Sequence, residues 1–492
     1  MDFKEPEPPK DTENTYKSIL KGISIFGGVK IFEILINLIR GKFVAIFLGP
    51  SGMGISSIFA NVSSTLSNLS SFGLNLAIVK EVAAAKDDAG RLNEVITVAK
   101  KLFYATALTG ALICILFSSL ISEISFGSRD YTMQVILLSV AIFLLVVNAG
   151  KLSILQGMHE VKRLSRASLT GSIAGLIFGI PLYYFFGSDG IVPAIIMLAL
   201  TLNIFYSINL KQSTRHLPTV NLSWCRHNLL IRTLFSLGII LMASDIIGNI
   251  CNYVLLIVIR EIGNLNDVGL FQAANNITNQ MMSVVITAMA LDYFPRLSKA
   301  AEDVKEMTKI INRQSEVITF IVLPISLLII ISSPLIVKVL LSPKFMVIIP
   351  LLRWMGLGIA LKAFAYPVAY ITFAKNNKKT FFWLEGVIGN LLFLIVPLIF
   401  FFNFGLIGFG YGMVVEQALC LLIYWCVNKR LYDYLPSAKI LRLFSIAIIS
   451  IAVILALSYY SDSPFGFTIM ITLSTTAILI SLYQLMRLFK KR

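Results

Sequence analysis

Charged side chains occur inside stretches of this sequence that are otherwise long runs of apolar residues. Four polar residues of the stretch 20–47 recur at spacings of 3, 4 and 3, on one helix face: Lys30, Glu33, Asn37 and Arg40. Lys42 lies off this face. Lys30 and Glu33 are placed to pair within the helix, which leaves Arg40 without an evident partner. A charge at the bilayer centre costs about 2.5–3.5 kcal/mol on insertion scales, so we expect this face to line a water-filled cavity, with polar contacts between helices as the alternative.

Amide and hydroxyl side chains form similar faces in three more apolar stretches. They are Asn61, Ser64, Asn68, Ser71 and Asn75 in 56–79; Asp245, Asn249 and Asn252 in 233–259; and Gln272, Asn276, Asn279 and Ser283 in 268–294. Any single Asn is explained as well by a hydrogen bond between helices as by a contact with a ligand. Taken together, the faces predict that these three stretches and 20–47 surround one hydrated cavity.

The second half of the chain adds interior charges of both signs. Arg353 and Lys362 lie in the stretch 346–373, and Glu416 lies in the middle of 406–427. Arg353 is close enough to the end of its stretch to reach the membrane surface, whereas Lys362 is deeper. Glu416 fits two roles equally well, as a proton or ion site and as the buried partner of Lys362.

These residues make up the candidate site. The candidate ligands of a transported substrate are Arg40, Lys42, Lys30, Arg353, Lys362, Asn37, Asn61, Asn249 and Asn276. The candidate ion-coupling acids are Glu33, Asp245 and Glu416.

Motifs for catalysis, nucleotide hydrolysis and metal binding are absent from the sequence. It contains no GxxxxGK[ST] phosphate loop, no HExxH and no Ser/His/Asp set. The three histidines and five cysteines show no metal-ligand spacing, so we predict no cofactor and no metal. No connection between apolar stretches exceeds about 25 residues, which leaves no soluble domain for a glycosyl donor. The sequence therefore favours a transporter over an enzyme.

The elements that carry these residues are predicted to be transmembrane helices. Hydrophobic residues make up 57% of the 492, and only 14% are charged, against about 25% in soluble domains. A span needs roughly 20 apolar residues, and on this measure the sequence predicts an all-α membrane protein with about 14 transmembrane helices. The limits are 20–47, 56–79, 102–121, 133–150, 167–186, 190–210, 233–259, 268–294, 315–333, 346–373, 380–401, 406–427, 440–459 and 465–486.

Basic residues alternate between the connections of these spans. With a cytoplasmic N-terminus, the inside connections hold 33 of the 42 Lys and Arg residues, the outside loops hold four, and five lie within spans. Basic loops resist translocation, so both termini are predicted to be cytoplasmic. The same distribution explains the net charge of +16 without nucleic acid and places a basic face against anionic lipid.

An internal repeat appears when the sequence is shifted by 215 residues. Gly54 then aligns with Gly269 and Asn61 with Asn276, and both copies lie in polar spans that follow a short outer loop. Because six spans separate the copies, the repeat is parallel, about an axis along the membrane normal. We predict a tail at 1–19, lobes at 20–215 and 216–430, a central cavity between them, and two appended spans with a basic tail at 431–492.

Several segments of the chain resemble a known family. They are RGKFVAIFLGPSGMGISSIFANVSSTL (40–66), DYFPRLSK (292–299), LLSPKF (340–345) and LLRWMGLGIALKAFAYPVAYITFAK (351–375). They are similar to Wzx-type flippases of O-antigen and enterobacterial common antigen, within the multidrug/oligosaccharidyl-lipid/polysaccharide exporter superfamily. The likeness extends over most of the first twelve spans.

The resemblance implies two six-helix lobes around a V-shaped cationic cavity, which Arg40, Lys42, Arg353 and Lys362 would supply. It implies an undecaprenyl-diphosphate-linked oligosaccharide as substrate, moved across the bacterial inner membrane by alternating access. A periplasmic polymerase and a chain-length regulator would be partners. The alternatives are a drug or cation exporter of the same superfamily, which favours acidic and aromatic cavity residues, and a membrane glycosyltransferase or ligase.

Overall fold

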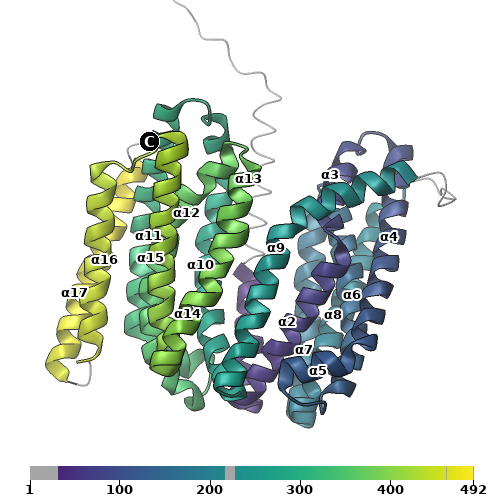
Figure 1. The fold of residues 1–492 in the computed structure, drawn as a ribbon, viewed down its shortest axis with the longest axis horizontal. Coiled ribbons are helices and arrows are strands. Elements are labelled where there is room, and N and C mark those ends of the chain that lie inside the picture. Colours follow the sequence, from purple (N-terminus) through teal and green to yellow (C-terminus); the bar gives the residue numbers. More distant parts are fainter. Residues whose placement is uncertain (1–30, 217–227, 461–462, 491–492) are drawn as a thin grey trace, which may run out of the picture.

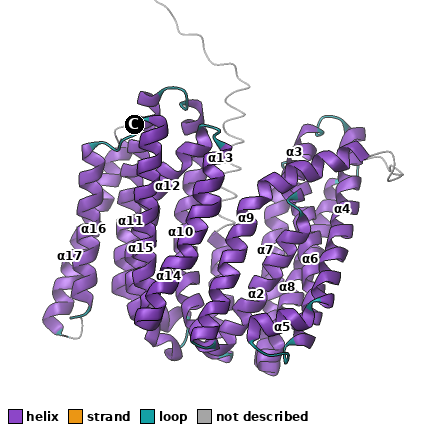
Figure 2. Cartoon of the chain, in the orientation of Figure 1, coloured by secondary structure: helices purple, strands orange, loops and turns teal. Residues whose placement is uncertain are grey.

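The computed structural model describes residues 31–216, 228–460 and 463–490, and within these ranges the chain is helical without strands (Figure 2). Helices are the expected solution for an apolar chain, because lipid offers no hydrogen-bond partner to an open backbone. Lys30 and residues 1–29 lie outside the described ranges, and the first span is therefore described only at 31–47.

The first half contains the helix 31–47 and seven labelled helices (Figure 1). They are α2 (Gly49–Ser71), α3 (Leu74–Ala84), α4 (Ala89–Leu116), α5 (Ser118–Phe126), α6 (Thr132–Gly157), α7 (Val161–Phe186) and α8 (Ile191–Ser213). Leu48 alone separates the first helix from α2, and Phe72 and Gly73 separate α2 from α3 in left-handed conformations, with φ of 47° and 66°. The predicted second span is therefore a broken helix that begins earlier than expected.

The second half follows the same plan and ends with two further helices. Its elements are α9 (Asn228–Ile262), α10 (Leu265–Lys299), α11 (Val304–Leu340), η3 (Pro343–Ile348), α12 (Ile349–Ala374), α13 (Lys378–Phe381), the π-helix η4 (Phe382–Gly389), α14 (Asn390–Phe404), α15 (Gly408–Tyr432), α16 (Ala438–Ser458) and α17 (Pro464–Lys490). α16 and α17 pack on α11 and α12, on the outer side of this half, where an appended pair is expected (Figure 1).

Eight helical stretches of the described ranges are long and apolar enough to cross a membrane, which makes this a multi-pass membrane protein. Two of them, Val161–Ser213 and Lys378–Tyr432, have 53 and 55 residues and contain several successive elements. The first consists of α7, η1 (Gly187–Gly190) and α8, and the second of α13, η4, α14, η5 (Gly405–Ile407) and α15. α2 is not one of these eight stretches, because the serines and asparagines that recur along it make it less apolar. The count of fourteen spans stays a prediction.

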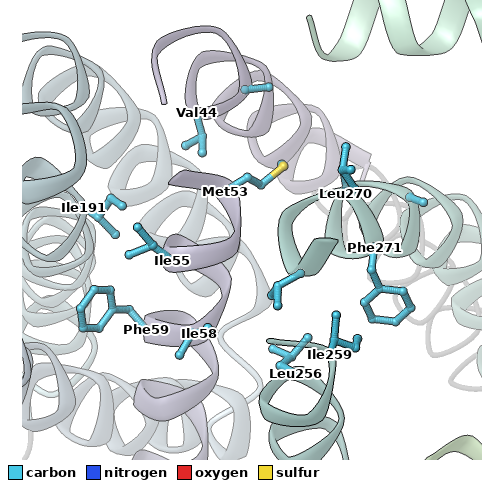
Figure 3. Close-up of a cluster of buried hydrophobic side chains, with 14 of the residues drawn as sticks. Val44, Met53, Ile55, Ile58, Phe59, Ile191, Leu256, Ile259, Leu270 and Phe271 are labelled. Atoms are coloured by element: carbon cyan, nitrogen blue, oxygen red, sulfur yellow. The ribbon is translucent and has the colours of Figure 1, made fainter. Parts of the chain in front are cut away.

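The buried apolar residues of the described ranges form three clusters, one shared by the two halves and two that lie almost entirely within one half. One apolar cluster combines Met53 and Phe59 of the first half with Leu256, Phe271 and Phe345 of the second. Figure 3 shows part of this cluster, where side chains of α2 face those of α9 and α10. Two other clusters lie almost entirely within one half each. The halves therefore share a core at one end. Toward the other end α9 stays with the first half, where it packs on α3, and Figure 1 shows α10 and α13 spreading away from it.

Two glycines mark the place where α2 and α10 cross within the shared core. A Cβ at Gly54 would lie 2.2 Å from the Leu265 carbonyl oxygen, and a Cβ at Gly269 would lie 1.8 Å from the Pro50 carbonyl oxygen. Both Gly54/Gly269 and Pro50/Leu265 are pairs 215 residues apart, so the contact is reciprocal. A reciprocal contact is the signature of a two-fold axis, here one that relates two copies of a repeat. The contact agrees with the offset of 215 residues, and the parallel orientation of the repeat stays a prediction.

Candidate functional site

A cavity of about 490 Å³ lies inside the second half, between α12, η4, α14 and α15. Each wall presents residues at a spacing of four, which is one face of a helix. They are Lys362, Tyr366 and Tyr370 on α12; Glu385, Gly389 and Phe393 along η4 and α14; and Glu416, Cys420 and Tyr424 on α15. The cavity thus combines one cation, two carboxylates and three phenols, which is a polar chamber within apolar helices.

Glu416 is the most deeply buried acid of this cavity, with 4% of its surface exposed. The Gln417 side-chain amide donates to both carboxylate oxygens, at 2.9 and 2.7 Å, and the Cys420 thiol lies 3.8 Å from one of them. Lys362 lines the same cavity without a direct ion pair to Glu416 in the described part of the chain. The hydrogen-bond partner of Glu416 is therefore Gln417, and its carboxylate remains beside open space.

The wall that carries Glu385 is irregular. Phe382–Gly389 is a π-helix, and the Asn390 side-chain amide donates to the carbonyl oxygens of Glu385 and Gly386, at 3.1 and 2.9 Å. π-Helical turns are rare and occur mostly at functional sites, because one extra residue re-aims the side chains around it. Here the turn brings the Glu385 carboxylate into the cavity, where it interacts with the Tyr424 hydroxyl.

The polar face of the first helix packs partly on α7. Glu33 accepts a hydrogen bond from the Ser168 hydroxyl. Arg40 donates to the Asn37 side-chain oxygen at 3.1 Å and forms no ion pair with an acidic residue among the described residues. Asn37 is exposed, and Lys42 is half-buried on the same helix. The Arg40 guanidinium is thus held by a neutral amide.

The amides of α2, α9 and α10 bond within their own helices or not at all. The Asn249 side chain donates to the Asp245 carbonyl at 2.9 Å, and Gln272 donates to Asn276 at 3.3 Å. The Asn61 side-chain oxygen is buried without a partner. Asn61 and Asn276 each lie seven residues, roughly 10 Å, beyond the glycine crossing toward the end where the helices spread. These contacts do not join helices, and the Asn61 oxygen is closed to solvent in this structure.

Arg353 occupies a different place from the other predicted ligands. Its guanidinium donates to the Ser458 carbonyl at 2.8 Å and to the Ser333 hydroxyl at 3.3 Å, which ties α12 to α16 and α11. It does not line the cavity that contains Lys362. The substrate role predicted for Arg353 stays a prediction that its contacts do not support.

The sequence reasoning overlooked most of the second-half cavity. Tyr366, Tyr370, Tyr424, Asn390 and Gln417 all line it and were not among the predicted site residues. The signal was present as the spacing of four that links these tyrosines to Lys362 and Glu416. Tyrosine is common in apolar helices, so spacing by itself does not separate a cavity wall from a packed interface.

The chain is similar in sequence to a known protein family and to proteins with assigned names. A family model described as polysaccharide biosynthesis protein matches residues 43–350. Proteins named Lipid III flippase, from Escherichia coli K12 and Shigella flexneri, are each 21% identical over 363 residues, covering 72% of this chain and 85% of theirs.

Two solved structures share the fold. One, titled lipid II flippase MurJ in an inward closed conformation, has a TM-score of 0.69 at 17% identity and covers 95% of this chain and 99% of its own. The other is an inward-facing multidrug resistance MATE family transporter of the MOP superfamily, with a TM-score of 0.69 at 17% identity, covering 83% and 94%. The fold is that of MOP-superfamily transporters, and the chain belongs to the polysaccharide biosynthesis protein family.

Proposed function

We propose that this chain is a flippase that moves an undecaprenyl-diphosphate-linked oligosaccharide, an O-antigen or related unit, from the cytoplasmic to the periplasmic leaflet of the bacterial inner membrane. The observation that carries the proposal is the one-sided closure: a mixed core joins the halves at one end, whereas toward the other end the second half contacts the first through α9, which packs on α3. Gly49 and Lys344, which meet at that end, belong to the predicted outside loops. The structure then corresponds to a state open to the cytoplasm, as alternating access requires before substrate enters.

The substrate class follows from the relatives together with the interior cations. Curated relatives over most of the chain carry the name Lipid III flippase. A diphosphate cannot enter an apolar bundle without cationic partners, because an unpaired buried charge is prohibitive. Within the described residues Arg40 is hydrogen-bonded to Asn37, so its remaining donors are available to phosphate oxygens, which the planar guanidinium binds in a bidentate way. We assign Lys30, Lys42, Lys362 and the cavity amides supporting roles.

We assign the coupling of transport to its energy source to the second-half cavity. The chain has no nucleotide-binding motif, so energy comes from an ion gradient or from removal of product by a periplasmic polymerase acting with a chain-length regulator. Glu416 and Glu385 face a cavity of about 490 Å³ with a single lysine, which suits an exchangeable proton or cation. Asp245 is a further candidate for the ion-coupling acid. It is exposed on α9, next to Ser244, which packs against Gly386 of the π-turn. Glu33, the remaining candidate, accepts a hydrogen bond from Ser168.

The second candidate function is export of a drug or another organic cation. The acidic and aromatic lining of the same cavity favours it, because tyrosine faces and carboxylates attract cations. The two functions differ in where a defect appears. Loss of a flippase leaves the lipid-linked oligosaccharide on the cytoplasmic leaflet, whereas loss of an exporter raises sensitivity to the cation and leaves surface polysaccharide intact. A glycosyltransferase defect would instead accumulate unglycosylated acceptor.

Replacement of Arg40 tests the diphosphate contact. A charge-assisted hydrogen bond contributes about 1.5–3 kcal/mol, so Arg40→Ala is expected to lower substrate affinity roughly 10- to 100-fold and to abolish surface polysaccharide at a near-normal protein level. Arg40→Lys should restore only part, because a point charge lacks the guanidinium fork. Arg129→Ala, which removes an exposed arginine paired with Glu123, is the matched control. Full polysaccharide from well-expressed Arg40→Ala would exclude the diphosphate role.

A further inference from the structure

A second polar cavity, of about 300 Å³, lies on the far side of the first half from the crossing of α2 and α10. It is enclosed by α4, α6 and α8, and three lysines line it: Lys100, Lys151 and Lys211. No carboxylate is among its lining residues. Three cations around one small volume repel one another, so this arrangement is costly unless an anion occupies the space.

Lys151 is the innermost of the three and has only neutral partners. It is 8% exposed, and its ammonium donates to the Asn203 side-chain oxygen at 3.0 Å and to the Ser207 hydroxyl at 2.7 Å. Asn203 in turn donates to Asn148 at 2.9 Å, which fixes its oxygen toward the lysine. A buried ammonium normally has a counter-charge, and none is present in the described part of the chain.

The surroundings of the cavity indicate what supplies the counter-charge. Lys100 begins a row on α4 that continues, every four residues, with exposed Tyr104, Leu108 and Leu112. Lys211 ends a similar row on α8 that runs through exposed Ile204 and Ile208. Both rows are exposed apolar surface, so they face the hydrocarbon of the membrane, and the lysines stand at their ends.

The dimensions match one leaflet. The row on α8 extends eleven residues from Lys211 back to exposed Leu200, roughly 16 Å at 1.5 Å per residue, which is half of a hydrocarbon core about 30 Å thick. The predicted cytoplasmic loops adjoin the lysine end of all three helices. Basic pockets between transmembrane helices on the cytoplasmic side suit anionic headgroups.

We propose that the lysine cavity of α4, α6 and α8 binds the phosphate of an anionic phospholipid from the cytoplasmic leaflet, with the acyl chains lying along the two apolar rows. The lipid is a bound component of the first half. It is separate from the transported substrate, which we place between the two halves. The proposal does not depend on what the protein transports.

The test measures lipid retained by the purified full chain after reconstitution into vesicles of phosphatidylglycerol and phosphatidylethanolamine, extraction and repeated washing. Mass spectrometry is expected to find phosphatidylglycerol retained in preference to phosphatidylethanolamine. At about 1 kcal/mol for each of the two lysines near the surface, the double variant Lys100→Gln/Lys211→Gln should lose roughly thirtyfold of the retention. This variant leaves Lys151 and its hydrogen bonds intact, and its thermal melting should match that of the unchanged protein.

The matched control removes three exposed lysines from the same predicted membrane face: Lys305→Gln/Lys378→Gln/Lys379→Gln. It should retain phosphatidylglycerol normally, whereas adding Lys151→Gln to the double variant should abolish retention. Equal loss in the control would overturn the proposal, because the effect would then be general surface charge. Complete release by inorganic phosphate, or preferential retention of undecaprenyl phosphate, would also overturn it, by showing a free-anion site or a site for the transported lipid.

Discussion

Glu416 and Arg40 illustrate how single polar residues are accommodated in an apolar helix. Each is held by one neutral amide, Gln417 and Asn37 respectively, rather than by an opposite charge. An amide satisfies part of the hydrogen-bonding capacity and leaves the charge uncompensated. A charged side chain held by a neutral amide is stabilised when an ion of opposite sign binds beside it, which is the property expected of a transport site.

At the residue scale, Glu416→Gln tests the ion-coupling role. Glutamine keeps the size and hydrogen bonding of the side chain and removes its charge, so the folded protein should be produced normally. Transport into vesicles should then become slow and independent of an imposed proton or sodium gradient. Glu316→Gln, which removes an acid paired with Lys439 on the outer side of the second half, serves as control. Full gradient dependence in Glu416→Gln would refute coupling through this residue.

At the scale of elements, two irregular places carry the functional geometry. The π-turn Phe382–Gly389 brings Glu385 into the second-half cavity, and Asn390 satisfies the carbonyls that the turn leaves poorly bonded. The crossing of α2 and α10 brings two backbones into contact through Gly54 and Gly269. The crossing does not tolerate extra volume, since the two backbones are already in contact there.

Gly269→Ala is expected to weaken the closed end of the molecule. The new methyl group would overlap the Pro50 carbonyl oxygen, and overpacking of this kind costs about 1–3 kcal/mol. The cost falls only on states in which α2 and α10 touch, so the equilibrium should move toward the outward-open state. The yield of a disulfide between cysteines placed at Ser51 and Asn266, which line one pocket at this end, should fall roughly tenfold.

Gly41→Ala is the control for this variant, because nothing lies within 4 Å of a Cβ at that position. Its disulfide yield should equal that of the unchanged protein. An undiminished yield in Gly269→Ala would show that the crossing is not a closure that opens during transport.

At the scale of the whole molecule, the predicted orientation rests on the basic residues, 33 of which lie in the predicted inside connections. This predicted orientation decides which side of the membrane the closed end faces. The shared core then lies toward the periplasm. With the opposite orientation, the same arrangement of helices would be a state open to the outside.

Cysteine labelling of intact cells decides the orientation. A membrane-impermeant reagent should reach cysteines at Ser51 and Asp189 and should not reach cysteines at Asp87 and Ala438, all of which are exposed in the structure. Asp87 and Ala438 are preferable to their neighbours Asp88 and Ser437, whose side chains cap α4 and α16. Exposed Cys426 must first be replaced, together with Cys225. Labelling at Asp87 or Ala438 would invalidate the predicted topology.

The sequence by itself determined the class of protein, the positions of most helices and the offset of the repeat. These depend on local composition and on spacing, because a bilayer imposes one helix length and one rule for basic loops. It also identified Lys362 and Glu416 as unusual residues, since an interior charge is conspicuous wherever the chain folds.

What only the tertiary structure decided is which of these residues meet. Lys362 and Glu416 share a cavity with Glu385 and three tyrosines, while Arg353, in the same helix as Lys362, anchors α16. The two residues are nine positions apart, two and a half turns, and therefore point to opposite sides of α12. Which side faces a cavity and which a neighbouring helix depends on packing between segments a hundred residues apart, and no local pattern contains that information.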